Sequence, residues 1–348
     1  MSPKVEKSIV VLGGGVAGMT SAIELARAGH SVHLVERAAH LGGLVRLHGA
    51  AAPGHEPPEK LLAHLKKDLE SYKAITVHLS SKLSKLEGEC PNAKATIEAH
   101  NKGSTTVHVS AVIIAIGAKP FDPRKLPEYK YGRSPSIVTT LEFEGMLKGG
   151  LPVNPQTKNN LKRVGFVQCV GSRMETRGNP WCSNICCGAT VKQAMLLKQR
   201  SPSTDVVVYY MDMRTFNRGQ EELYAESRIL GVKYTRGIPS EVITRPDGTL
   251  IVRAEDASLG KIVERELDLL VLSIGLEPQV GGSDLLKILG IVQPKDNFVP
   301  IMSSESKPME TGVKGVFVAG AAEFPKNIKD TVTQAKGAVT EVINYLVN

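Results

Sequence analysis

The chain has 348 residues, of which 42% are hydrophobic and 22% charged, so it is long enough to form two globular domains. Its formal net charge is +8, but the basic residues are spread along the chain and aromatic residues make up only 5%, which argues against a nucleic-acid-binding protein. The start of the chain lacks the apolar core of a signal peptide, and no stretch approaches the roughly 20 apolar residues of a membrane span. We therefore expect a cytoplasmic protein whose thiols stay reduced.

The chain opens with the pattern of a dinucleotide-binding unit. A buried strand, a glycine-rich turn, a helix and a second strand are predicted in turn over residues 8–12, 13–18, 19–28 and 32–35. The turn matches G-x-G-x-x-G through Gly13, Gly15 and Gly18, with Val16 and Ala17 between the last two. Because the strand, the helix, the second strand and the acidic residue after it are all present, this fingerprint predicts a Rossmann-type unit.

Each part of the fingerprint has a physical task. Gly13 allows a tight turn, Gly15 lets the backbone approach a pyrophosphate, and Gly18 lets the helix pack closely on the strand. The helix N-terminus offers free N–H groups to the phosphates. Glu36, at the end of the second strand, is placed to accept hydrogen bonds from the adenosine ribose hydroxyls.

The stretch after Glu36 favours FAD over NAD. It runs from Arg37 to the pair Gly42 and Gly43 and on to Leu44, and it resembles a segment of flavoproteins with two dinucleotide-binding domains. In those proteins the glycine pair brings backbone against the flavin pyrophosphate. The alternative at this point is a plain NAD-binding unit followed by a glycine turn.

Two further segments argue for the flavin. A buried strand over residues 112–116 ends at Gly117, and another near the C-terminus ends at Gly320; both resemble strands of the same flavoprotein superfamily. Ala321 stands where an aspartate usually contacts the ribityl chain, so backbone or water must take that role. Three flavoprotein segments in the right order predict bound FAD.

A helix is expected from Asp330 to the C-terminus, because Asp330 and Thr331 are residue types that cap helix N-termini. In the same superfamily this helix points its N-terminus at the flavin, where its dipole favours negative charge on the reduced ring. Lys326 and Thr331 are therefore candidate flavin contacts, and Lys326 is the candidate catalytic residue. The alternative is a solvated loop followed by an ordinary cap.

Residues 158–278 predict a second Rossmann-like unit without a second glycine fingerprint. The strand over 163–168 is followed by Cys169, and three more cysteines follow, giving C-x12-C-x3-C-C at Cys169, Cys182, Cys186 and Cys187. The last pair opens a predicted helix. Later helical and strand patterns at 221–230 and 269–273 complete the unit.

Four thiolates in nineteen residues suit soft metal chemistry. The spacing is not that of a ferredoxin, so a [4Fe–4S] cluster, a redox-active dithiol, and zinc or inert thiols all remain open from spacing alone. A disulfide between the adjacent Cys186 and Cys187 would be strained. Cys90, the fifth cysteine, stands alone and is expected to be an incidental thiol.

Four segments together resemble the A subunit of heterodisulfide reductase. They are C-V-G-S-R from Cys169, W-C-S-N-I-C-C-G from Trp181, the stretch from Glu221 to Gly237, and F-P-K-N-I-K-D-T-V-T-Q-A from Phe324. The resemblance runs from about residue 8 to the end. It implies a thioredoxin-reductase-like flavoprotein with FAD near Lys326 and a [4Fe–4S] cluster on the four clustered cysteines, and it implies a homodimer within a larger electron-transfer complex.

The length of the chain and its residues 50–55 indicate which members of this family the chain resembles most. Methanogen relatives carry additional ferredoxin-type clusters and have cysteines in that segment, whereas this chain has neither. It is most similar to the short A-like subunit of the heterodisulfide-reductase-like complex of sulfur-oxidising bacteria. The resemblance then implies other subunits of that complex as partners, and a sulfur-carrier or lipoate-carrying protein as an electron source for the complex.

The expected fold is α/β, with an inserted smaller domain. Residues 1–122 and 279–348 are assigned to a discontinuous FAD-binding domain, 158–278 to the inserted Rossmann-like domain with the cysteines, and 123–157 to a linker. We expect FAD and the cluster to exchange electrons with partner subunits. The alternatives are a stand-alone NAD(P)H-dependent disulfide reductase and a non-catalytic assembly protein without turnover.

Overall fold

The computed structural model describes residues 8–49, 51, 56–100 and 103–347. The chain forms two compact units. The first comprises Met1–Arg46, Glu59–Lys119 and Pro278–Asn348, and the second comprises Leu47–Pro58 and Pro120–Glu277. The segment 50–55, on which the expected difference from methanogen relatives rests, lies outside the described residues except for residue 51.

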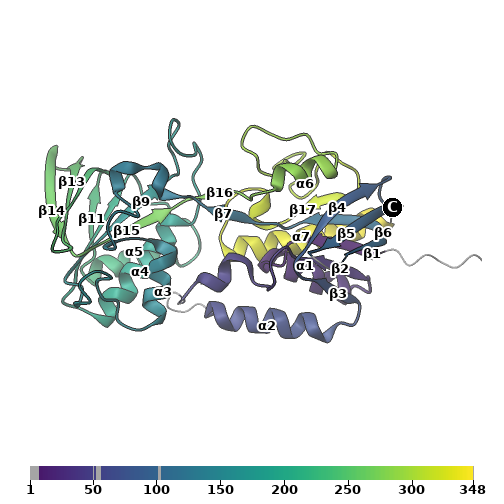
Figure 1. Ribbon diagram of the computed structural model, residues 1–348, viewed down its shortest axis with the longest axis horizontal. Helices are drawn as coiled ribbons and strands as arrows, with labels where there is room; N and C mark the ends of the chain where they lie inside the picture. The colour runs from purple at the N-terminus through teal and green to yellow at the C-terminus, as the bar shows by residue number, and fades with distance from the viewer. Residues whose placement is uncertain (1–7, 50, 52–55, 101–102, 348) are drawn as a thin grey trace, which may run out of the picture. The chain divides into compact units, whose positions relative to one another are not determined.

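The first unit, drawn mainly in purple, blue and yellow in Figure 1, is built on a seven-stranded sheet. Its strands are β1 (Ser8–Leu12), β2 (Val32–Val35), β3 (Ile75–His78), β4 (Ser81–Glu87), β5 (Ala93–Ala99), β6 (Gly103–Ile114) and β17 (Val316–Val318). They follow the order β3-β2-β1-β6-β5-β4, with β17 also paired to β6. The strands β1, β2, β3 and β17 join parallel pairs, whereas β4 and β5 form antiparallel pairs.

Helices cover both faces of this sheet. They are α1 (Val16–Arg27), α2 (Pro58–Ser71), α6 (Gly282–Ile288) and α7 (Ile328–Val347), with short 3-10 turns η1 (Gly43–Leu47) and η4 (Gly320–Ala322). Ile9 and Val11 of β1 pack into a core shared with α1 and α7, while Val10 and Leu12 pack into a second core shared with α6. A parallel strand buried on both faces needs a continuous apolar run, which is why the sequence pattern predicted β1 with its observed bounds.

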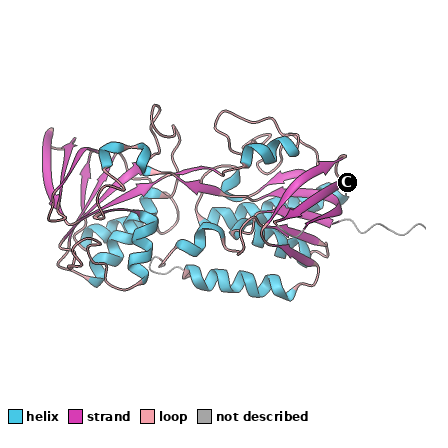
Figure 2. Ribbon diagram, in the orientation of Figure 1, coloured by secondary structure: helices cyan, strands magenta, loops and turns pink. Residues whose placement is uncertain are grey.

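The second unit is also layered (Figure 2), around a parallel sheet in the order β11-β10-β9-β15-β8. Its strands are β8 (Ile137–Thr139), β9 (Arg163–Val170), β10 (Asp205–Tyr210), β11 (Lys233–Arg236) and β15 (Leu269–Ile274). The helices of the unit are α3 (Thr140–Lys148), α4 (Cys186–Arg200) and α5 (Gln220–Ile229). Phe143 of α3 and Leu197 of α4 pack with Phe166 of β9 on one face of the sheet.

The other face of this sheet packs against an antiparallel meander that the sequence analysis did not predict. It is formed by β12 (Pro239–Thr244), β13 (Leu250–Asp256) and β14 (Lys261–Leu267). Its apolar residues Val242 and Val252 share a core with Val167 and Val170 of β9. Apart from the segment Leu47–Pro58, the chain enters the unit through β7 (Ala118–Pro120) and leaves it through β16 (Leu276–Pro278), and these two strands pair.

Residues 123–157, which the sequence analysis assigns to a linker, have regular structure within the second unit. They contain the 3-10 turns η2 (Pro123–Lys125) and η3 (Pro127–Tyr129), the strand β8 and the helix α3. The start of α3 has a capping box, in which Thr139 and Glu142 satisfy each other's backbone N–H groups.

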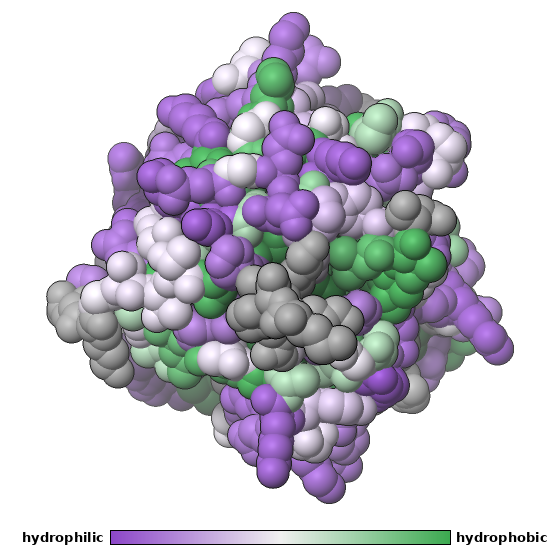
Figure 3. Space-filling view, turned by 90° about the vertical axis from the view of Figure 1, so that its right-hand side faces the viewer, coloured by the Kyte–Doolittle hydropathy of each residue, from purple (hydrophilic) through white to green (hydrophobic). Residues whose placement is uncertain are grey.

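None of the helices in the described part of the chain is long and apolar enough to cross a membrane. On the face shown in Figure 3, hydrophilic side chains cover most of the surface, and hydrophobic side chains gather in one area toward the right of the view.

Candidate functional site

The glycine-rich turn joins β1 to α1, and two of its glycines leave no room for a side chain. A Cβ on Gly18 would lie 1.7 Å from the carbonyl oxygen of Gly13, which is the close helix–strand packing expected for this position. Gly13 has φ +112°, and its Cβ would lie 2.3 Å from the carbonyl oxygen of Ala115 at the end of β6. The glycine-rich turn therefore packs closely against both α1 and the sheet. Val16 and Ala17 are buried at the start of α1.

Glu36 lies beside this turn. Its Oε2 accepts a 2.6 Å hydrogen bond from the N–H of Gly14, and its Oε1 accepts a 2.7 Å hydrogen bond from the N–H of Ala38. A carboxylate has about four acceptor positions, so two fixed hydrogen bonds still leave capacity for ribose hydroxyls. The arrangement orients the carboxylate at the end of β2, where the sequence analysis expects it to bind the adenosine ribose.

The second glycine segment lies against the first. The N–H of Gly42 donates to the carbonyl of Gly14 at 2.8 Å, and a Cβ on Gly43 would lie 3.1 Å from the Cα of Gly15. Leu44 follows in η1, half-buried. Arg37 is turned to the carbonyl of Val280, to which its Nη1 donates at 2.8 Å. Backbone from two separate segments therefore forms one narrow surface, as a pyrophosphate site requires.

The C-terminal segments of the unit reach the same turn. A Cβ on Gly320 would lie 2.7 Å from the Cβ of Ala17 and 3.2 Å from Cγ2 of Thr331. The N–H of Gly320 donates to Oε1 of Gln334 at 2.8 Å, a contact that the sequence analysis missed. Ala321 follows in η4 and offers no side-chain oxygen. Gly117, in the loop after β6, has φ +69° and open space where its Cβ would stand.

The predicted start of the C-terminal helix was wrong by two residues. Helix α7 begins at Ile328 rather than at Asp330, and the capping side chain is Asn327, whose Oδ1 accepts a 2.8 Å hydrogen bond from the N–H of Asp330. Asp330 and Thr331 lie inside the first turn. Because Asn caps helices as well as Asp or Thr, the residue types alone did not fix the boundary.

Lys326 is held by three acceptors of its own loop. Its Nζ donates to the carbonyls of Gly320 and Phe324 and to the carboxylate of Glu323, at 2.7 to 2.9 Å. Burial lowers the pKa of this amine, and Glu323 partly opposes that effect. A lysine ammonium has three N–H groups, so its donors are fully used in fastening the loop after β17. A direct flavin contact therefore requires one of these bonds to be given up.

In the second unit, all four clustered cysteines line one pocket. Cys169 is at the end of β9, Cys182 lies in the following loop, and Cys186 and Cys187 open α4. The other residues of the pocket wall are Arg173, Ser183, Asn184, Ile185, Asp212 and Arg214. The sequence spacing predicted that the cysteines meet, and the structure brings them together; the charged side chains of the wall were not predicted.

The backbone around the pocket has an unusual conformation. Cys169, Arg173 and Asn184 all have φ between +55° and +59°, a region that residues other than glycine rarely adopt. Hydrogen bonds hold this path: Oγ of Ser172 and Oγ of Ser183 are 2.6 Å apart, and the latter accepts from the N–H of Leu276 at 2.9 Å. Backbone strain of this kind persists only where the surrounding structure enforces it, and it clusters at functional sites.

The environment disfavours free thiolates at three of the four cysteines. Burial, together with the neighbouring thiols, raises the pKa of Cys169 to about 12, and it raises the pKa values of Cys186 and Cys187. All five cysteines of the chain are free thiols. A bound metal centre would reverse this situation, because coordination to a cation deprotonates a thiol.

The four pocket cysteines could supply the four thiolate ligands of an iron–sulfur cluster. Among the described residues, no group of three or more His, Cys, Asp or Glu side chains converges closely enough to hold one metal ion. A [4Fe–4S] cluster takes one cysteine at each of its four iron atoms. Backbone N–H groups of Asn184 and Arg214 point at the sulfurs of Cys182 and Cys187, each at 3.4 Å, as expected around cluster ligands.

Cys90 lies outside this site. It is buried in the first unit, 5% exposed, and burial raises its pKa to about 11. It packs with the apolar residues around β4 and β5, which agrees with the expectation of an incidental thiol.

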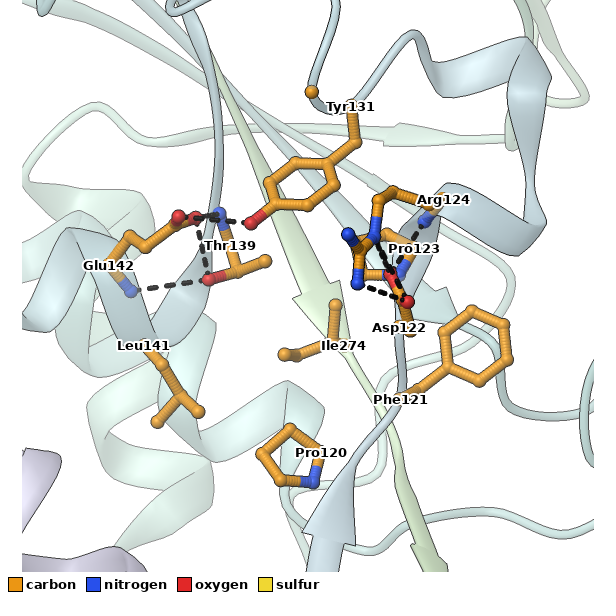
Figure 4. A pocket seen from close by; sticks show the side chains of 11 residues that line it. Pro120, Phe121, Asp122, Pro123, Arg124, Tyr131, Thr139, Leu141, Glu142 and Ile274 are labelled. Atoms are coloured by element: carbon orange, nitrogen blue, oxygen red, sulfur yellow. Dashed lines mark hydrogen bonds and ion pairs between the residues drawn. The ribbon is translucent and has the colours of Figure 1, made fainter.

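The second unit has another cavity, of about 530 Å³, beside the ends of β8 and β15. Figure 4 shows its apolar wall, including Phe121, Leu141 and Ile274, and its polar groups. The hydroxyl of Tyr131 donates to Glu142 at 2.9 Å, and Arg124 pairs with the nearby Asp122. These polar groups are therefore paired with one another within the wall.

The chain is similar to a family model and to two curated proteins. A family model described as pyridine nucleotide-disulphide oxidoreductase matches residues 7–146. The A subunit of the H(2):CoB-CoM heterodisulfide,ferredoxin reductase from Methanothermobacter marburgensis is 42% identical over 238 residues, which cover 67% of this chain and 36% of that protein. The iron-sulfur A subunit of the CoB--CoM heterodisulfide reductase from Methanocaldococcus jannaschii is 31% identical, with 97% of this chain and 64% of that protein covered.

The chain thus spans less than two thirds of the length of these curated relatives. A solved structure, thioredoxin reductase of Lactococcus lactis, matches it with a TM-score of 0.65 at 19% identity, and 98% of this chain and 99% of that one are covered. The chain therefore has the thioredoxin-reductase-like fold with two dinucleotide-binding domains, and it belongs to the family of heterodisulfide reductase A subunits.

Proposed function

We propose that this chain is an oxidoreductase subunit that binds FAD in its first unit and a [4Fe–4S] cluster on Cys169, Cys182, Cys186 and Cys187 in its second. The observation that carries the proposal is the lining of one pocket by all four cysteines, at the carboxyl ends of β9 and β10. Ligands of open parallel sheets bind at this edge. The names of the relatives, one of which is called an iron-sulfur protein, support the same interpretation.

The chain's own residues have distinct tasks in this proposal. The glycine turn and the segment at Gly42 and Gly43 form the surface for the pyrophosphate of FAD, and Glu36 binds the ribose. The N-terminus of α4 and the N–H groups of Asn184 and Arg214 stabilise negative charge on the sulfurs. When bound, the flavin supplies two-electron chemistry and the cluster supplies one-electron transfer.

Partner proteins form part of the proposal. The relatives are named as subunits of heterodisulfide reductases, so we propose that this chain works with other subunits of a heterodisulfide-reductase-like complex. We also propose a cytoplasmic location. A homodimer, a role in sulfur oxidation and a sulfur-carrier or lipoate-carrying protein as electron source rest on the sequence resemblance. The assignment of the first unit as FAD domain rests on its glycine segments, and that of the second as cluster domain rests on its four pocket cysteines.

Anaerobic purification followed by an absorption spectrum and assays of iron and acid-labile sulfide tests this proposal. We expect flavin bands together with about four iron and four sulfide per chain. Flavin bands without iron or sulfide, under strict exclusion of oxygen, would contradict the cluster.

A second candidate is a stand-alone NAD(P)H-dependent disulfide reductase. It is favoured by the match to the pyridine nucleotide-disulphide oxidoreductase model. It requires a reactive thiol pair, and Cys186 and Cys187 are both buried. Rapid bleaching of the flavin by NADPH, coupled to disulfide reduction by the isolated chain, would support this candidate. Electron transfer only in mixtures with partner subunits would instead support the complex, and an isolated chain that never turns over would fit an assembly role.

A further inference from the structure

The wall of the cysteine pocket contains one arginine whose position is fixed on both sides. Arg173 follows Cys169 by four residues, and its side chain is 22% exposed. Its guanidinium is paired with the carboxylate of Asp212, with Nη2 at 3.1 Å from Oδ2 and a shorter contact through Nη1. Its backbone N–H donates to the carbonyl of Trp181 at 2.9 Å, directly before Cys182.

We propose that Arg173 is a positioning residue that sets the reduction potential of the cluster, by holding a positive charge beside the sulfur of Cys169. This inference rests on the proposed function, because it requires a cluster on the four cysteines. It names a task for a side chain that ligates no iron in that proposal.

The geometry gives the guanidinium two neighbours of opposite character. On one side it lines the same pocket as Cys169, and on the other it forms the ion pair with Asp212. The left-handed backbone of Arg173, at φ +59°, and that of Cys169, at φ +58°, turn both side chains into the same pocket. An arginine used only for surface solubility would not need this enforced conformation.

Asp212 orients the cation rather than simply cancelling it. It follows β10, while Arg173 follows β9, so the ion pair joins the two loops that form the pocket wall. Asp212 also lies near Arg214, at 3.5 Å between Nε and Oδ1, so the wall carries two arginines and one carboxylate. The net positive charge favours any state of the site that is more negative.

Reduction of a cluster adds one electron and therefore one negative charge. A fixed cation near a ligand sulfur stabilises the reduced form and raises the reduction potential, since hydrogen bonds and charge around the sulfurs control that potential. Removal of the cation must then lower it. Lysine at this position keeps the positive charge but cannot form the two parallel hydrogen bonds of a guanidinium. Arg173→Lys should therefore lower the reduction potential less than a neutral substitution does.

The test is a potentiometric titration of the anaerobic full-length protein, with dithionite as reductant and the cluster followed by electron paramagnetic resonance. Iron and sulfide are assayed on every sample. We expect Arg173→Gln to retain iron and to shift the midpoint potential to more negative values, and Arg173→Lys to lie between it and wild type. Arg177→Gln is the matched control, because Arg177 is on the same loop but pairs with Glu128 at the surface, and it should leave the potential unchanged.

The outcomes separate this inference from the proposed function. Wild-type protein without iron would contradict the cluster itself. A wild-type cluster whose potential is the same in Arg173→Gln as in Arg177→Gln would overturn the role of Arg173 and leave the cluster standing. If Arg173→Gln loses its iron, the Arg173→Lys variant distinguishes the two explanations. Iron retained in Arg173→Lys with a near-native potential supports the role of the positive charge. Loss of iron in both variants shows that Arg173 is needed for packing and overturns the role in setting the potential.

Discussion

The carboxylate of Glu36 accepts a 2.6 Å hydrogen bond from the backbone N–H of Gly14, so the acidic end of β2 is fastened to the glycine turn that follows β1. The N–H of Ala38 binds the other carboxylate oxygen. The neighbouring strands β1 and β2 thus place the glycine turn and the oriented carboxylate of Glu36 next to each other. This is the geometry on which the proposed FAD site depends.

Substitution Glu36→Gln should weaken FAD binding by about tenfold to a hundredfold, because it replaces one charged acceptor by an amide group and hydrogen bonds to charged groups are worth about 1.5–3 kcal/mol. Flavin retained after gel filtration, and a fluorescence titration of the apoprotein with FAD, measure the effect. Glu98→Gln, at an exposed position of β5, is the control and should bind FAD as wild type does. Equal affinities in the two variants would contradict the role of Glu36.

Two helical glycines should respond to alanine in opposite directions. In α1, Gly18→Ala places a methyl group 1.7 Å from the carbonyl oxygen of Gly13, so we expect a loss of about 1–3 kcal/mol or failure to fold. In α3, Gly145→Ala meets nothing within 4 Å and should gain about 0.5–1 kcal/mol. Urea denaturation followed by circular dichroism measures both. Similar stabilities would show that α1 is not packed on the turn as described.

Glu144 and Lys192 form a buried ion pair, and removal of one partner should lower the free energy of unfolding. Their side chains are 3% and 11% exposed. Burial alone would raise the pKa of Glu144, but Lys192, Gln193 and the N–H of Gly49 outweigh it and hold this pKa below its ordinary value. Lys192→Met should therefore cost about 3–5 kcal/mol, since it leaves a buried carboxylate without its cation.

The double variant Glu144→Gln with Lys192→Met should recover much of that loss, because neither charge then remains. The free energy of unfolding of the single and double variants measures the effect. A double variant as unstable as the sum of the two single variants would contradict a coupled pair.

The stability of the first unit should fall in mild acid because of His78. Its Nε2 is 2.9 Å from Nδ1 of His33 on the neighbouring strand, and burial lowers its pKa. A group whose pKa is lower in the folded state binds more protons when unfolded, so its contribution to stability is full above the ordinary histidine pKa, about 6.5, and is lost as the pH falls through the folded value.

Urea denaturation between pH 7.5 and 5 should therefore show a smaller loss of stability for His78→Gln than for wild type. His40→Gln changes an exposed histidine and serves as the control, with a pH dependence like that of wild type. If His78→Gln loses as much stability as wild type over this range, the protonation of His78 does not contribute.

The elements predicted correctly from the sequence are those with a continuous apolar or glycine signature. β1 and β2 have the predicted bounds, because β1 is fully buried, β2 is buried except for the half-buried His33, and the strands end at a glycine turn and at Glu36. The meander β12–β14 and the pair β4 and β5 escaped prediction. Residues of β4 and β5 alternate between buried and more exposed positions, and most residues of β12 and β14 are not buried. Such patterns are weak signals where charged residues occupy the outer face.

The parts of the candidate site that depend on local sequence spacing were predicted. The parts that depend on contacts between distant segments were missed. The convergence of Cys186 and Cys187 with Cys169 follows from a strand end that meets a helix start. The partnership of Arg173 with Asp212 does not, because 39 residues separate them and only the packing of β9 beside β10 brings them together. The capping by Asn327 was missed because several cap-type residues lie within one helical turn.

The most direct test of the cluster is the iron and sulfide content of five single cysteine variants, purified without oxygen alongside wild type. We expect Ala at Cys169, Cys182, Cys186 or Cys187 to lower iron and sulfide far below about four per chain and to remove the cluster absorption, while the flavin bands remain. Cys90→Ala should keep the wild-type content, because Cys90 lies in the core of the other unit. Full iron and sulfide in variants of the four pocket cysteines, or their loss only in Cys90→Ala, would contradict the account.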